Sequence, residues 1–417
     1  MLRIPRAYLE VLSQKDFLLL VLVILIGRLA TAFLLLSLVV STFSQTGSSF
    51  GVSGVILSFA IPGFLLTAFA GVAADVFDRR KIIIAANILI TLPVIFIVVL
   101  KQTVYASIPF SLVYFVGNSF FLPAASAVSA QLVARQYLLI SNSIFIISLA
   151  IGMILGMFLA SLVHFFFGSG ATLVICAILL IIAAALSFFL PSLLPSKKKE
   201  ISLLRSLGEI WRGFIYVFNN KVVWIFFLIF SLTQGIVAVG LTLAPGFFND
   251  VVNLSVSQSP IFILPLIGVG VVIAAVFLHL PNLKEGFLVS AGTGLLGFAL
   301  IIIGLVIKLK IVSSQYLLWP MAIFLVTIGF AVTLTMIASR ARLQKEINHR
   351  LQGTVFGANI ILSSFLAAIM SPASAAFEVL FGYIDIAIFG GIGLAILATF
   401  LFFVDRRWKF RAEFSPF

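Results

Sequence analysis

The stretch FLLLVLVILIGRLATAFLLLSLVVSTF, residues 17–43, is a long apolar run that carries one charged side chain, Arg28. A helix of about 20 apolar residues crosses the roughly 30 Å hydrocarbon core of a bilayer. An arginine at that depth costs about 3 to 10 kcal/mol unless it meets water or a partner. The stretch therefore predicts a membrane-spanning helix in which Arg28 has a specific role.

The composition of the whole chain agrees with this interpretation. Of its 417 residues, 62% are hydrophobic and only 9% are charged, which excludes a water-soluble protein of this length. The apolar runs are continuous rather than alternating, which excludes a β-barrel and favours helices. The single cysteine, Cys176, excludes a disulfide framework or a zinc cluster, and no metal or cofactor is expected.

Apolar runs of membrane-spanning length occur along nearly the whole chain. We predict an all-α polytopic membrane protein with twelve transmembrane helices. Their ranges are 17–43, 51–74, 82–100, 105–133, 139–167, 170–191, 222–248, 259–280, 287–307, 316–338, 354–377 and 383–404.

The basic residues orient these spans. If the N-terminus is cytoplasmic, 22 of the 26 Lys and Arg residues lie on the cytoplasmic side, and only Lys101, Lys308 and Lys310 lie outside. This asymmetry follows the positive-inside rule. It predicts a plasma membrane protein with both termini in the cytoplasm. It also accounts for the net charge of +13 without a nucleic-acid partner.

A polar segment divides the spans into six and six. We predict an N-terminal bundle over 1–191, a cytoplasmic linker over 192–221 and a C-terminal bundle over 222–417. Within the linker, apolar residues recur on one face of a predicted helix that lies along the membrane surface, although a plain polar linker is the alternative. These apolar residues are Leu203, Leu204, Leu207, Ile210, Trp211, Phe214 and Phe218.

The two halves have similar spacing. A shift of 206 residues places the first span on the seventh and Arg28 on Gln234. Two pseudo-symmetric six-helix bundles with a site at the interface between repeats are typical of a transporter.

A loop between the second and third spans carries the most specific motif. It reads GVAADVFDRRKIII, residues 71–84, and it resembles the signature loop of the major facilitator superfamily. The second acid, Asp78, makes it similar to the exporter branch for drugs, macrolides and siderophores. The segments 123–145 and 344–359 are also similar to that branch. The resemblance implies the major facilitator fold and secondary active transport by alternating access.

The same resemblance implies that the loop is a gating latch. Gly71 is expected to let two helices approach closely, and Asp75 to accept hydrogen bonds from the N-terminus of the eleventh span. Arg79, Arg80 and Lys81 are expected to pair with Asp75 and with lipid phosphates. The alternative is that the basic residues only anchor the topology.

The membrane interior contains no carboxylate in this span assignment, so Arg28 has no internal counter-ion. Two hypotheses stay open: Arg28 binds a negative group on the substrate, or it serves only helix packing. We expect Asn118 and Gln234 to be further polar contacts for the substrate.

The same lack of a carboxylate bears on energy coupling, because proton pumps use an ionisable relay at that depth. In the fifth span, Met157 stands where many antiporters of this family carry proline. Coupling is therefore expected to use groups near the outer ends, namely Glu378, Asp385 or His164. Uncoupled diffusion through the carrier is the alternative.

The function predicted from these features is the export of an amphiphilic small molecule by a secondary transporter. The alternatives are a lysolipid or lipid translocator, an uptake carrier for organic anions, and a non-transporting receptor on the same fold. No set of catalytic groups is present in the sequence, so we expect no enzyme. No Walker loop is present, so we expect no use of ATP. The predicted partners are a small-molecule substrate and membrane lipids, and a monomer is expected.

Overall fold

The computed structural model describes residues 6–192, 203–278, 284–313, 316–347 and 351–413 of the chain. Ten of the helices in these ranges are long and apolar enough to cross a membrane. They are α2 (Lys15–Thr46), α3 (Ser49–Val76), α4 (Arg79–Val99), α5 (Val104–Gln131), α6 (Leu138–Ser187), α8 (Lys221–Gly246), α9 (Ser259–Phe277), α10 (Glu285–Lys308), α11 (Leu318–Glu346) and α12 (Gln352–Glu413). Shorter elements are α1 (Arg6–Leu12), the 3-10 helix η1 (Arg135–Tyr137), α7 (Leu203–Asn219) and the π-helix η2 (Phe247–Val251).

Two of the ten helices each supply two spans. Helix α6 has 50 residues and α12 has 62, about twice what a bilayer needs. Each is broken by a glycine with a non-helical backbone, Gly168 (φ 77°) and Gly382 (φ 76°). The described residues therefore contain twelve apolar segments, which confirms the predicted all-α membrane fold.

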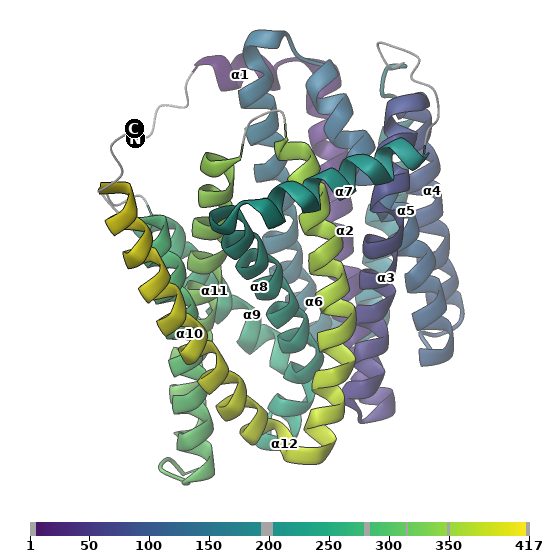
Figure 1. The fold of residues 1–417 in the computed structure, drawn as a ribbon. Helices are drawn as coiled ribbons and strands as arrows, with labels where there is room; N and C mark the ends of the chain where they lie inside the picture. The colour runs from purple at the N-terminus through teal and green to yellow at the C-terminus, as the bar shows by residue number, and fades with distance from the viewer. Residues whose placement is uncertain (1–5, 193–202, 279–283, 314–315, 348–350, 414–417) are drawn as a thin grey trace. The chain divides into compact units, whose positions relative to one another are not determined.

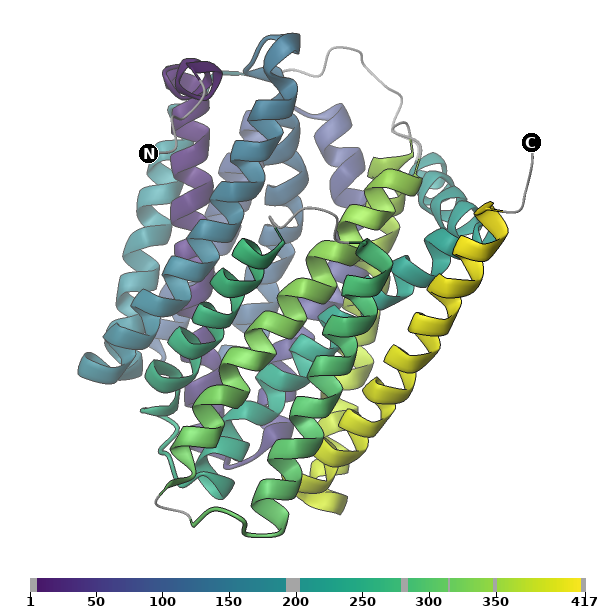
Figure 2. The same ribbon diagram turned by 90° about the vertical axis from the view of Figure 1, so that its left-hand side faces the viewer.

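The chain forms two compact units. The first comprises Met1–Gly47 and Gly54–Trp211, and the second comprises Ser48–Ser53 and Arg212–Phe417. In the first unit α2 packs against α6 and α5, and α4 packs against α5 and α6. In the second unit α12 packs against α8 and α10, and α11 packs against α8, α9 and α10. Within each unit the long helices run up and down beside one another (Figures 1 and 2).

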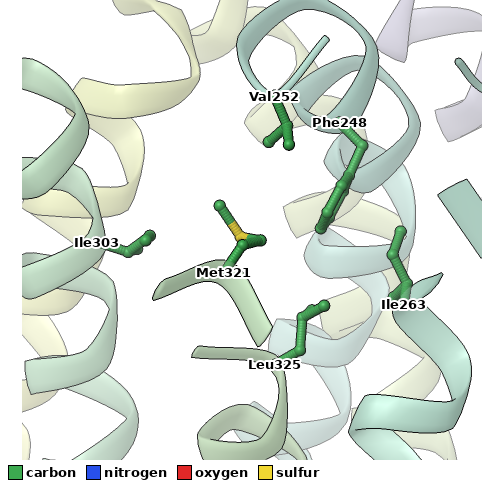
Figure 3. Packing of buried hydrophobic residues seen from close by; sticks show 6 residues of the cluster. All are labelled: Phe248, Val252, Ile263, Ile303, Met321 and Leu325. Atoms are coloured by element: carbon green, nitrogen blue, oxygen red, sulfur yellow. The ribbon is translucent and has the colours of Figure 1, made fainter. Parts of the chain in front are cut away.

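The second unit has a well-defined apolar cluster. Figure 3 shows Met321 and Leu325 of α11 pointing toward Phe248 and Val252 at η2 and toward Ile263 of α9. Met321 is completely buried. The π-helix η2 extends the end of α8, and this packing holds it against α9 and α11.

The linker contains the predicted helix, α7, which runs crosswise to α8 (Figure 1). Its Val217 is completely buried, and the Phe214 ring packs edge-on against Phe227 of α8 at 6.0 Å between ring centroids. Trp211 and Phe218 lie on the same side of the helix as Phe214, three residues before it and four after it, and they are 65% and 59% exposed. The predicted apolar face is thus broad: part of it packs on α8, and Trp211 and Phe218 on the rest of it stay exposed.

We predict that the break at Gly168 tolerates no side chain. With φ 77° and ψ −178°, this residue occupies a region that is essentially limited to glycine, at a cost of about 1–3 kcal/mol for other residues. Gly168→Ala should therefore lower the melting temperature in detergent. Gly170→Ala is the matched control, because Gly170 is helical and a Cβ there meets no atom within 4 Å. A Gly168→Ala protein as stable as the Gly170→Ala protein would contradict the prediction.

Candidate functional site

Arg28 lies in the middle of α2, 13 residues or about 20 Å after the helix begins at Lys15. Its side chain is half-buried, and its Nη2 donates a hydrogen bond of 2.6 Å to Oδ1 of Asn118. Asn118 lies on α5 and is only 8% exposed. The structure therefore brings together two of the residues expected to contact the substrate.

A second polar link joins the same helices one turn away. The hydroxyls of Thr31 on α2 and Tyr114 on α5 are 2.8 Å apart, and Tyr114 is 1% exposed. The Thr31 hydroxyl donates to the carbonyl of Gly27, so Tyr114 donates to Thr31. The sequence motifs did not indicate this link. The available signal was the spacing of Thr31 three residues after Arg28 and of Tyr114 four residues before Asn118, which places each pair on one helix face.

Two glycines let neighbouring helices pack closely against the backbones that carry Arg28 and Asn118. A Cβ at Gly152 of α6 would lie 2.6 Å from the Cβ of Arg28 and 2.9 Å from the carbonyl oxygen of Leu25. A Cβ at Gly117 of α5 would lie 2.9 Å from the Ile90 side chain of α4. Helix α6 thus supports α2 at Arg28, and α4 supports α5 beside Asn118.

The positive charge of Arg28 has no described counter-ion. Its Nε is buried and has no hydrogen-bond partner among the described residues. The ion pairs found in the described parts of the chain lie elsewhere, between Lys308 and Asp385 and around Glu285 and Glu346. Asn118 supplies only the partial charge of an amide oxygen, so the guanidinium retains capacity for an anionic ligand.

Gln234 lies at the corresponding place in the second unit. It follows the start of α8 at Lys221 by 13 residues, the same offset as Arg28 in α2. Its side chain is half-buried and makes no hydrogen bond to another described residue.

The loop between α3 and α4 makes its described contacts within the first unit. Asp78 caps α4, accepting from the backbone N–H of Arg80 at 3.0 Å and from the Ser192 hydroxyl at 3.0 Å. The Arg79 Nε donates to the carbonyl of Ala74 at 3.0 Å, and the Arg80 Nη2 donates to the carbonyl of Phe188 at 2.6 Å. Both guanidinium groups therefore bind carbonyls at helix ends, where the negative end of the helix dipole favours a cation.

Gly71, Asp75 and Lys81 are the other residues of this loop that were expected to form the latch. At Gly71 a Cβ would meet no described atom within 4 Å, and the expected close approach of two helices there stays a prediction. The side chain of Asp75, at the end of α3, lies outside the described part, so its pairing stays a prediction. Lys81 is exposed and makes no ion pair with a described residue.

The three candidates for ion coupling have different surroundings. Asp385 pairs with Lys308 of α10, with 2.5 Å between the carboxylate oxygen and the ammonium nitrogen. Glu378 is half-buried and interacts electrostatically with Tyr383, also on α12. His164 of α6 is 4% exposed, and its Nδ1 has no hydrogen-bond partner among the described residues.

Comparisons with known proteins identify a family that matches this chain. A sequence model described as "Major Facilitator Superfamily" matches residues 17–372. A comparison with curated protein sequences gives no match.

Solved structures share the fold at low sequence identity. The nucleoside transporter NupG is 16% identical with a TM-score of 0.71, covering 93% of this chain and 99% of its own. A POT family transporter in complex with 5-aminolevulinic acid is 13% identical with a TM-score of 0.76, covering 94% and 96%. The human organic anion transporter TETRAN is 18% identical with a TM-score of 0.62, covering 93% and 99%. At these identities the likeness shows the fold alone.

We predict that Gly152 is required for the position of Arg28. In Gly152→Ala the new methyl group overlaps the Arg28 Cβ and the backbone of α2, and such overpacking costs about 1–3 kcal/mol. The melting temperature should fall. Gly27→Ala is the matched control, since it adds the same methyl group next to Arg28 where no atom lies within 4 Å. Equal melting temperatures for the two variants would contradict the close contact of α6 with α2.

Proposed function

The chain belongs to the Major Facilitator Superfamily, and we propose that it exports an amphiphilic small molecule across the membrane by alternating access. It is a multi-pass membrane carrier and not an enzyme. The solved structures of the same fold include carriers of nucleosides and organic anions, so the fold does not select the substrate.

The observation that carries the proposal is the charge of Arg28, which has no counter-ion in the described part of the chain. An arginine at mid-membrane is tolerated when it meets a cavity, a partner or a ligand. Asn118 satisfies one of its donors, and the buried Nε has no hydrogen-bond partner among the described residues. A carboxylate, sulfate or phosphate on the substrate supplies the missing charge and binds the planar guanidinium through two oxygens.

The surroundings favour an amphiphile over a small hydrophilic anion. Apart from Thr31, the flanking positions on α2 are apolar, including Leu25 and Leu29. Gln234 is proposed as a further polar contact. The loop motif with Asp78 supports assignment to the exporter branch. Arg28 would suit an uptake carrier for organic anions or a lysolipid translocator equally well, and transport direction in oriented vesicles separates these from an exporter.

The remaining assignments rest on charge distribution and sequence. We place the protein in the plasma membrane as a monomer, with two six-helix bundles joined by the 192–221 linker and both termini cytoplasmic. The basic asymmetry supports this orientation. No Walker loop is present in the sequence, so transport is proposed to run without ATP.

Coupling, where present, is proposed to use Glu378, Asp385 or His164. All three belong to α6 or α12 near the breaks at Gly168 and Gly382. Proton-driven flux that survives replacement of all three would exclude this assignment.

We also propose that the loop of Gly71, Asp75, Arg79, Arg80 and Lys81 is a gating latch that biases the equilibrium between the conformations of the carrier. Its arginines bind helix-end carbonyls at Ala74 and Phe188, so any movement of α3 or α6 changes these bonds.

Replacement of Arg28 should change substrate selectivity. Arg28→Ala is expected to lower affinity for an anionic amphiphile about 10- to 100-fold, which is the loss of a charge-assisted hydrogen bond. Arg28→Lys keeps the charge and loses the planar fork, so a smaller loss is expected. The measurement is binding of an amphiphile in matched carboxylate and neutral amide forms to protein in nanodiscs, together with the melting temperature.

Thr31→Val and Tyr114→Phe are the matched controls for Arg28, because they break the neighbouring link between the same helices without removing charge. They should lower the melting temperature and leave the preference for the carboxylate form unchanged. If Arg28→Ala behaves as these controls do, the arginine serves packing, and the proposed role in binding fails.

The gating proposal predicts transport defects without folding defects. Asp75→Asn and Arg79→Ala should slow transport in proteoliposomes by at least about fivefold, because the loop biases the conformational equilibrium. Membrane insertion should stay normal. Lys101→Gln is the control, since it removes an exposed charge from the turn at the other end of α4. Wild-type rates in both loop variants would reduce the basic residues to a topology anchor.

A further inference from the structure

The first unit has an open groove on its surface between α4 and the second part of α6. Its volume is about 520 Å³, within the range of small-molecule sites. The lining residues are Ile88, Thr91, Leu92, Ile181, Ala184, Ala185, Phe188 and Phe189.

The groove offers only apolar contacts. Leu92 of α4 is 49% exposed, and Ile181 and Phe188 of α6 are each 50% exposed. The one polar side chain of the lining, Thr91, donates its hydroxyl to the carbonyl of Asn87 at 2.7 Å. The groove therefore suits a flexible hydrocarbon chain and has no spare group to bind a polar ligand along its length.

Cationic side chains lie at one end of the groove. The Arg80 guanidinium bonds the carbonyl of the lining residue Phe188 at 2.6 Å, which places it at this end. Lys81 is exposed and lies seven residues before Ile88, about 10 Å along the helix axis. Since Ile88 and Lys81 are two helical turns apart, they lie on the same side of α4.

The groove therefore matches the layout of a phospholipid, with charged side chains at one end for the headgroup and an apolar lining beyond them for an acyl chain. The cations lie at the end of α4 where its sequence begins, and the apolar groove continues toward the middle of the span. The helix N-cap, Asp78, is already bonded to Ser192 and to the Arg80 backbone. Lys81 is exposed and makes no ion pair with a described residue, so its ammonium group can meet an anion at this end.

We propose that this groove binds one resident phospholipid with an anionic headgroup, whose phosphate contacts Lys81 and Arg80 while an acyl chain lies along Leu92, Ile181 and Ala185. The site lies within the first unit and is separate from Arg28. The bound lipid is a structural ligand of the carrier and is not the transported molecule. The lipid would contact both the loop between α3 and α4 and the end of α6, which the hydrogen bond from Arg80 to the Phe188 carbonyl already joins.

The test measures binding of single lipids by native mass spectrometry. Delipidated full-length protein in detergent is titrated with phosphatidylglycerol and, separately, with phosphatidylcholine of the same acyl chains. The wild-type protein should bind its first phosphatidylglycerol about fivefold more tightly than phosphatidylcholine, the contribution of one basic residue near a lipid phosphate.

Two variants test the two ends of the site. Lys81→Gln should reduce phosphatidylglycerol affinity to that of phosphatidylcholine, and Lys101→Gln is its control. Ala185→Trp fills the groove from an exposed position and should weaken both lipids. Val276→Trp is its control, because Val276 is 66% exposed on α9, in the second unit.

Several outcomes would overturn the proposal. Equal affinities for the two lipids in the wild-type protein would exclude the anionic headgroup. Unchanged lipid binding in Ala185→Trp would exclude the groove. Monomeric Ala185→Trp protein derived from a wild-type dimer would show that a second copy of the chain occupies the groove. These measurements do not involve substrate transport, so the lipid site and the proposed function can fail independently.

Discussion

The hydrocarbon interior of a bilayer offers no partner to a backbone N–H or C=O group, and this constraint governs the whole chain. Each group left unpaired there costs several kcal/mol, so the spans must be helices that satisfy their own backbones. Loops separate most of the spans from one another. In each of the two longest helices, α6 and α12, two spans are separated only by a local break in the helix. Gly168 and Gly382 make these breaks because a glycine reaches a positive φ without steric cost.

An apolar helix surface gains little hydrophobic free energy when it leaves lipid for another apolar helix. The helices of the bundle are therefore held together by close van der Waals packing. The contacts at small residues show how this is achieved. Gly270 of α9 and Gly329 of α11 each face the other helix's backbone, with a hypothetical Cβ only 2.1 Å from a carbonyl oxygen. Gly297 of α10 and Gly391 of α12 form a similar reciprocal contact. The same device at Gly152 supports the backbone of Arg28.

Polar side chains inside the bundle are therefore stable only where this packing supplies hydrogen-bond partners. In the second unit, Asn359 of α12 donates to the Ser231 hydroxyl of α8 at 2.8 Å, and Thr242 and Ser371 join the same two helices. In the first unit, Thr31 and Tyr114 join α2 to α5 in the same way. Arg28 differs from all of these because its partner is neutral while it carries a full charge. That imbalance distinguishes a candidate binding group from a structural one.

The sequence by itself determined the spans, because apolar length and helix-breaking residues act locally. It located the break near Gly168 between the predicted spans 139–167 and 170–191, and it identified α7 from its periodicity. It also singled out Arg28 and Asn118, since a charged or amide side chain is unusual at that depth.

Only the tertiary structure decided which residues meet. Arg28 and Asn118 are 90 positions apart, and their contact depends on the rotation of α2 and α5 about their axes, which small residues such as Gly117 and Gly152 set. The same holds for the bond of Arg80 to the Phe188 carbonyl and for the groove between α4 and α6.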